Sequence, residues 1–150
     1  MTDPGHSGTP QLQKLGITPG ARLRVLNPPA DWSFAEPTDD VHLVEDGTCD
    51  IALVFVREAS ELSAARRWGE LVYPSGACWI AWPRKAGGHV SDVDENAVRE
   101  AALGVGLVDV KVAAIDDDWS GLEVVWRREN RSTGRISKKA VQDALGHDAS

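Results

Sequence analysis

The chain has 150 residues, of which 42% are hydrophobic and six are tryptophan, and its formal net charge is −7. This length and composition fit one globular domain and exclude global disorder. The negative charge argues against nucleic acid or an anionic membrane as the main partner, and no apolar run approaches the roughly 18 residues of a membrane-spanning helix.

The first third of the chain predicts an arm and two strands. Residues 1–12 are expected to form a flexible arm ahead of a domain that spans residues 13–128. A first strand is predicted at Leu23–Asn27 and a short second strand at Val41–Val44, with a mostly irregular connector between them.

The middle of the chain alternates strands with helices. The continuous apolar runs Ile51–Val56 and Ala77–Trp82 predict strands that are buried on both faces. Between them, Ser60 can cap a helix that runs to about residue 72. A second helix is predicted to be capped by Ser91 or Asp92, with acidic residues in its first turn.

The last third predicts a β-hairpin and a polar extension. Val110–Ile115 and Leu122–Arg127 predict two strands, with Ser120 and Gly121 closing the turn between them. Residues 129–150 are predicted to be a polar extension. In it Ser137 starts a short helix that carries apolar side chains on one side, at Ala140, Val141, Ala144 and Leu145.

The order of these elements predicts an α/β fold with a mixed, mostly parallel sheet, a C-terminal antiparallel hairpin and helices on its faces. One connection constrains the sheet further. Parallel neighbouring strands need a crossover of about a dozen residues, and only three residues separate Glu45 and Asp46 from Asp50. We therefore expect Val41–Val44 to be antiparallel to its neighbours, which places Glu45 and Asp46 at the wrong end of the sheet to bind a ribose.

Several segments resemble known folds. Residues 71–82 look like the helix, Pro-Gly turn and fifth strand of class I methyltransferase-like folds, and residues 106–112 resemble the entry into their sixth strand. More closely, residues 14–128 resemble a bacterial family of unknown function. Its members share a Leu-Gly-Ile-x-Pro-Gly segment, a Trp-Pro-basic-Lys segment, a Glu-Asn helix start and an Asp-x-x-Trp-Ser-Gly-Leu hairpin. These stand here at residues 15–20, 82–85, 95–96 and 116–122. The resemblance implies a single, reduced methyltransferase-like (Rossmann-like) domain without an established activity.

The turn after the first strand lacks the glycines that a nucleotide site needs. Asn27 is followed by Pro28 and Pro29, which offer no N–H groups and have a fixed φ. We therefore expect no cofactor, and in particular no S-adenosylmethionine. The Asn-Pro-Pro run is similar to a motif of amino-group methyltransferases, but that motif follows the fourth strand and ends in an aromatic residue, whereas here Ala30 follows. A rigid turn is favoured.

The carboxyl ends of the predicted strands carry the candidate ligand-binding residues, which are Asn27, Arg57, Trp82, Arg84 and Lys85. Open α/β sheets bind ligands at this edge, and the three cations could hold an anionic ligand. In the alternative, these cations pair with acidic residues of the following loop and only order it. Those acids are Asp92, Asp94 and Glu95.

Cysteine and histidine usage predicts neither a disulfide framework nor a metal site. Cys49 and Cys78 are too few for such a framework, and we expect both thiols to be buried and reduced. The four histidines are scattered along the chain. Because the N-terminal residues 1–13 lack the apolar stretch of a signal peptide, we expect a cytoplasmic protein.

Together these features lead to one functional hypothesis with two alternatives. The leading hypothesis is a non-catalytic methyltransferase-like domain that binds a partner protein or a small anionic ligand. The first alternative is a divergent S-adenosylmethionine-dependent methyltransferase. The second is a homo-oligomeric structural protein.

Overall fold

The structure is a computed structural model that describes residues 10–130. Residues 1–9 of the expected arm lie outside the described residues. The same holds for residues 131–150, including the helix expected from Ser137.

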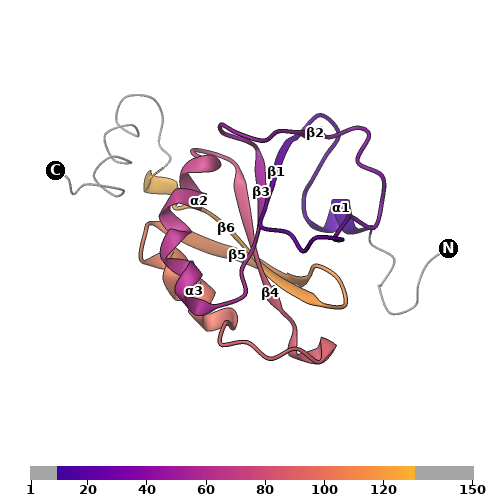
Figure 1. Ribbon diagram of the computed structural model, residues 1–150. Helices are drawn as coiled ribbons and strands as arrows, with labels where there is room; N and C mark the ends of the chain where they lie inside the picture. Colours follow the sequence, from indigo (N-terminus) through magenta and orange to yellow (C-terminus); the bar gives the residue numbers. More distant parts are fainter. Residues whose placement is uncertain (1–9, 131–150) are drawn as a thin grey trace.

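Six strands form one sheet in the order β2-β1-β3-β4-β6-β5 (Figure 1). Strands β1 to β4 are parallel to one another, and β6 is antiparallel to both β4 and β5. The expected fold class, α/β with a mixed sheet and a C-terminal antiparallel pair, is confirmed. The strands are β1 (Arg22–Leu26), β2 (His42–Leu43), β3 (Ile51–Phe55), β4 (Ala77–Pro83), β5 (Leu107–Ala114) and β6 (Trp119–Trp126).

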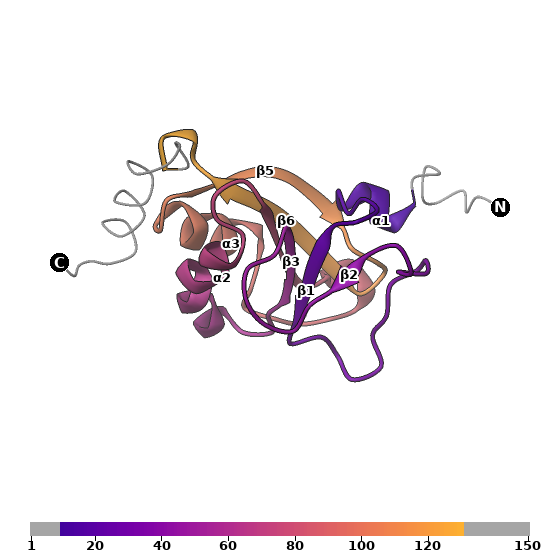
Figure 2. The same ribbon diagram turned by 90° about the horizontal axis from the view of Figure 1, so that it is seen from above.

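Helices cover both faces of the sheet. Figure 2 shows α2 (Ala65–Leu71) and α3 (Glu95–Leu103) on one face and the short α1 (Gln11–Lys14) on the other. Three short 3-10 helices complete the described elements, at η2 (Ala59–Ala64), η3 (Lys85–Gly87) and η4 (Arg128–Asn130). Within residues 10–130, every helix is too short or too polar to cross a membrane.

The core consists of two apolar clusters, one on each face of the sheet. Along β3, Ala52 and Val54 belong to the cluster beneath α2 and α3, whereas Leu53 and Phe55 belong to the cluster on the α1 side. All five residues of β3 are buried. The alternation explains why the sequence of this strand is continuously apolar, and it confirms the prediction of strands buried on both faces.

Both helices on the α2–α3 face begin differently from the prediction. The segment expected to be one helix from Ser60 starts as the 3-10 helix η2 and becomes α-helical only at Ala65. The N-cap of α3 is Asp94, whose Oδ1 accepts the N–H of Ala97 at 2.9 Å. Ser91 and Asp92 do not cap α3. Instead they bind the segment after β3, because Ser91 donates to the carbonyl of Arg57 and Asp92 accepts the N–H of Ala59.

The short strand β2 is parallel to β1, so the expectation of an antiparallel strand was wrong. The crossover rule applies to neighbouring strands of ordinary length. Here β1 lies between β2 and β3, and β2 has only two residues. Leu43 at the end of β2 and Ile51 at the start of β3 both lie opposite Leu23 of β1, so the chain needs almost no return along the strand direction, and residues 44–50 suffice to cross β1. The segment that carries Glu45 and Asp46 begins and ends beside the first two residues of β1, so these acids stay away from the turn at Asn27 even though β2 is parallel.

The hairpin turn is shorter than predicted, because it closes at Asp116–Asp118 and β6 begins at Trp119 rather than at Leu122. Oδ1 of Asp116 accepts the N–H groups of Asp118 and Trp119, which closes the turn before β6 begins. Ser120 and Gly121 are paired with β4 inside the sheet. Gly121 is required there by close packing, since a Cβ atom would lie 2.6 Å from Cδ1 of Ile115.

Candidate functional site

The sheet order defines the edge at which a ligand would bind. The chain leaves β1 for β2 on one side and then crosses to β3 on the other side, so the strand order reverses between β1 and β3. Open α/β sheets bind ligands outside the carboxyl ends of the strands at such a point. Three of the candidate residues follow these ends directly, namely Asn27 after β1, Arg57 shortly after β3 and Arg84 after β4.

The turn at the end of β1 offers little to a phosphate or nucleoside. Asn27 has a φ of 58°, a left-handed conformation that asparagine adopts more readily than most residues. Pro28 and Pro29 follow, and neither has an N–H group. The carbonyl of Pro29 accepts the N–H of Trp32 at 3.0 Å, so the turn continues directly into this aromatic residue.

Trp32 and Phe34 cover the carboxyl end of β3. The indole of Trp32 meets Phe34 and Phe55 edge to face, with ring centroids 4.7 and 4.9 Å apart. Phe55 meets Trp119 in the same way at 4.8 Å. Such arrangements are favoured by the aromatic quadrupoles and exclude water. Aromatic side chains from the connection after β1 therefore pack against the end of β3 beside the reversal point.

Asp116 fixes Trp32 in this position. Its Oδ2 accepts the indole N–H of Trp32 at 2.9 Å, while its Oδ1 closes the hairpin turn. Both carboxylate oxygens are therefore engaged within the protein. This carboxylate holds the β1–β2 connection to the β5–β6 turn.

A second set of hydrogen bonds ties the same connection to α1. The carboxylate of Glu36 accepts the N–H groups of Gln11 and Leu12, each at 2.8 Å, and so serves the open N-terminus of α1. The buried side chain of Gln11 accepts the N–H of Ala35 and donates to the carbonyl of Ile115. Residues 27–41 are thus fixed to two separate parts of the domain.

The cations at this edge gather around the hairpin turn. The guanidinium carbon of Arg57 lies 5.6 Å from the ring centroid of Trp119, a cation–π contact. Arg84 donates from its guanidinium to the carbonyl of Asp116 at 3.1 Å. Lys85 is exposed in η3. Within residues 10–130, none of these three side chains forms an ion pair.

The acids that were expected as alternative partners bind elsewhere. Asp92 accepts the N–H of Ala59, Asp94 caps α3, and Glu95 pairs with Arg99. The η3 loop is instead held by the pair between His89 and Asp118 at 3.0 Å and by backbone bonds of Arg84. The described cations at the edge are therefore not neutralised by the loop that follows β4.

The remaining two candidate residues, Trp82 and Asn27, lie in different surroundings. Trp82 is buried in the cluster on the α2–α3 face. Asn27 is exposed at the end of β1, and its side chain makes no hydrogen bond among the described residues. Sequence reasoning missed Trp32 and Asp116. The available signal was the Trp-x-Phe pair at residues 32–34, since two large aromatic residues are unusual in an otherwise polar connector.

No family model and no curated protein sequence matches this chain. Solved structures with a similar course of the chain are TnmH (17% identity, TM-score 0.48) and a protein of the NADB-Rossmann superfamily from Streptococcus agalactiae (9%, 0.47). A third is a proposed methyltransferase from Thermoplasma acidophilum (7%, 0.44). The matches cover 77%, 88% and 73% of this chain and 45%, 72% and 70% of those chains, so this chain spans less than half of TnmH.

Proposed function

We propose that this protein is a non-catalytic domain with a methyltransferase-like fold, and that its carboxyl edge binds an anionic group. The anionic group is carried by a partner protein or by a small ligand. The observation that carries the proposal is the position of Trp32, which packs on Phe55 and is held by Asp116 where a nucleoside would otherwise lie. The chain's own aromatic side chains thus fill the place of a cofactor.

The electrostatics of the edge support recognition of an anion. Arg57 and Arg84 both contact the hairpin turn, and Lys85 is exposed next to Arg84. Stacking on Trp119 pre-organises the guanidinium of Arg57 and leaves its N–H groups available to a carboxylate or phosphate. These positive groups stand out on a chain of net charge −7, because acidic groups dominate the rest of it.

The divergent methyltransferase is the alternative, and the acids after β2 do not favour it. Although β2 is parallel to β1, the N–H of Val44 donates to the carbonyl of Leu23 and the N–H of Asp50 donates to the carbonyl of Arg22. The segment that carries Glu45 and Asp46 therefore begins and ends beside the first two residues of β1, away from the carboxyl edge at which such folds bind a ribose. Pro28, Pro29 and Trp32 also weigh against a cofactor.

Calorimetric titration of the full chain with S-adenosylmethionine tests the non-catalytic proposal. We expect no binding tighter than a Kd of about 100 μM, which corresponds to roughly 5.5 kcal/mol. Binding at that affinity or better contradicts the proposal. The matched variant is Trp32→Gly, which empties the space over Phe55. Binding by this variant alone would identify the Trp32 side chain as the group that closes the site.

Anion binding is tested separately by following the indole N–H signal of Trp119 in NMR spectra. An Asp/Glu-rich peptide serves as the probe for a partner protein, and inorganic phosphate as the probe for a small ligand. We expect Arg57→Gln to abolish the response to the effective probe. Arg22→Gln, at the opposite end of the sheet, is the control and should keep it. If the indole N–H signal of Trp119 shifts with neither probe, the proposal that the carboxyl edge binds an anionic group is contradicted. Sedimentation of the same samples tests the homo-oligomer alternative.

A further inference from the structure

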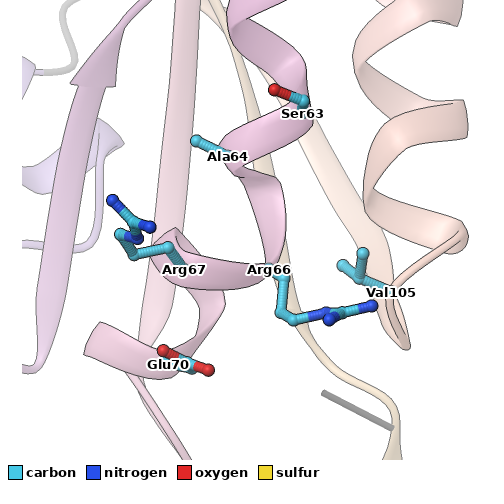
Figure 3. A pocket seen from close by; sticks show the side chains of 6 residues that line it. All are labelled: Ser63, Ala64, Arg66, Arg67, Glu70 and Val105. Carbon is cyan, nitrogen blue, oxygen red and sulfur yellow. The ribbon is translucent and has the colours of Figure 1, made fainter. Parts of the chain in front are cut away.

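A groove lies on the α2–α3 side of the molecule, away from the carboxyl edge. It has a volume of about 490 Å3 and is open to solvent. Figure 3 shows its lining. Ser63 and Ala64 come from η2, Val105 follows α3, and the remaining lining residues, Arg66, Arg67 and Glu70, come from α2.

Two of the three charged side chains that α2 contributes to this groove are neighbours of opposite sign. Arg67 and Glu70 are three residues apart, which places them next to each other on the helix surface. Figure 3 shows both on the side of α2 away from Val105. Both are exposed, and neither forms an ion pair within the described part of the chain. Beside Arg66, the groove therefore offers the guanidinium of Arg67 and the carboxylate of Glu70 to an occupant.

The described chain ends beside this groove. Asn130 donates from its side-chain amide to the carbonyl of Gly106 at 3.1 Å, and the N–H of Arg127 donates to the same carbonyl. Gly106 directly follows Val105, which lines the groove. The indole of Trp126 reaches the carbonyl of Gly69, so the chain leaves β6 near the C-terminal half of α2.

The sequence that follows has the composition of a matching occupant. From Ser137, a helical spacing brings apolar residues to one side, at Ala140, Val141, Ala144 and Leu145. Lys139 and Asp143 are four residues apart and share a helix side. Residues 131–136 can span roughly 20 Å when extended, which exceeds the roughly 10 Å length of α2.

We propose that residues 137–145 of this same chain pack into the groove as a short helix antiparallel to α2. In this orientation Lys139 lies beside Glu70 and Asp143 lies beside Arg67. The charges select the antiparallel direction, because the parallel one would place Lys139 beside Arg67 and Asp143 beside Glu70. The apolar side of the segment then covers Ala64 and Val105.

Hydrogen exchange of the full-length chain, followed by mass spectrometry, tests the proposal. We expect the amides of residues 138–146 to exchange at least about tenfold more slowly than in a free peptide of residues 131–150. Arg67→Glu should abolish most of this protection, and so should Asp143→Lys. The double variant Arg67→Glu/Asp143→Lys should restore it. Lys85→Glu, on the other edge of the molecule, is the charge-matched control and should leave the protection unchanged.

Three results would overturn the proposal. One is exchange of residues 138–146 at the rate of the free peptide. Another is protection that Arg67→Glu leaves intact, because the segment would then pack elsewhere. The third is protection that disappears on dilution together with a dimer in sedimentation, because the groove would then hold the segment of a second copy. Protection that is independent of concentration in a monomer, with rescue by the double variant, supports it.

Discussion

The indole N–H of Trp32 donates to Oδ2 of Asp116 at 2.9 Å, across 84 positions of the sequence. This bond joins the connection after β1 to the turn between β5 and β6. It holds an aromatic side chain over the carboxyl end of β3, where open α/β sheets bind ligands. The bond therefore links the stability of the domain to the closure of its candidate site.

Substitution of Asp116 tests how much this link contributes. Asp116→Ala removes the acceptor of Trp32 and of two backbone N–H groups, so we expect the free energy of unfolding to fall by about 2–4 kcal/mol. Urea denaturation measures it. Asp117→Ala is the matched control, because this neighbouring acid is exposed and its side chain makes no hydrogen bond among the described residues. Equal effects of the two substitutions would show that the Trp32 bond contributes little.

Trp119 is predicted to be a major source of stability. It is 9% exposed, meets Phe55 edge to face and lies under the guanidinium of Arg57. Burial of an indole removes on the order of 200 Å2 from water, and Trp119→Ala should cost roughly 3 kcal/mol or more. The midpoint of thermal unfolding reports the change. Trp119→Phe keeps an aromatic ring and should lose less stability than Trp119→Ala. An unchanged midpoint in the alanine variant would instead favour a partner-binding role for Trp119.

Substitution by alanine should have different effects on stability at two glycines. A Cβ at Gly121 would lie 2.6 Å from Cδ1 of Ile115 and 3.0 Å from the Trp79 ring, so Gly121→Ala should destabilise the fold by about 1–3 kcal/mol. Gly104, at the end of α3, has a right-handed helical conformation, and its nearest neighbour would be 3.4 Å away. Gly104→Ala should therefore be neutral or stabilise slightly. Chemical denaturation of both variants checks the contrast, and a similar loss in both would refute the packing argument.

The two buried thiols predict a loss of stability at alkaline pH. Burial raises the pKa of the Cys78 thiol, and burial is also the main reason that the pKa of the Cys49 thiol is raised. Because the folded pKa lies above the unfolded one, this stability is fully present below pH of about 8.5 and declines as the pH rises further. The unfolding free energy should then fall by up to about 1.4 kcal/mol per pH unit for each thiol.

Denaturation between pH 8 and pH 10 measures this slope. The control is the double variant Cys49→Ala/Cys78→Ala, which lacks both thiols and should show a flatter dependence over the same range. A slope that is the same in both proteins would mean that other groups govern the alkaline transition.

Local sequence patterns predicted much of the fold. The continuous apolar runs at residues 51–56 and 77–82 became β3 and β4, because a strand with a core on both faces needs apolar residues at every position. The alternation of strands and helices was sufficient to assign the α/β class. From that class it followed that ligands would bind at the carboxyl edge of the sheet. It also followed that Arg57 and Arg84 lie at the carboxyl ends of strands.

The direction of β2 and the cover over the candidate site were decided only by the tertiary structure. The sequence contains no signal for β1 lying between β2 and β3, and this placement is what makes a short return compatible with parallel strands. Trp32 and Asp116 meet through the folding of two distant segments onto one edge, and each looked like an ordinary loop residue in its own neighbourhood. Local patterns report which face of an element is buried, because that depends on neighbouring residues. Contacts between loops depend on where every strand lies in the sheet, and that is fixed only when the whole domain has formed.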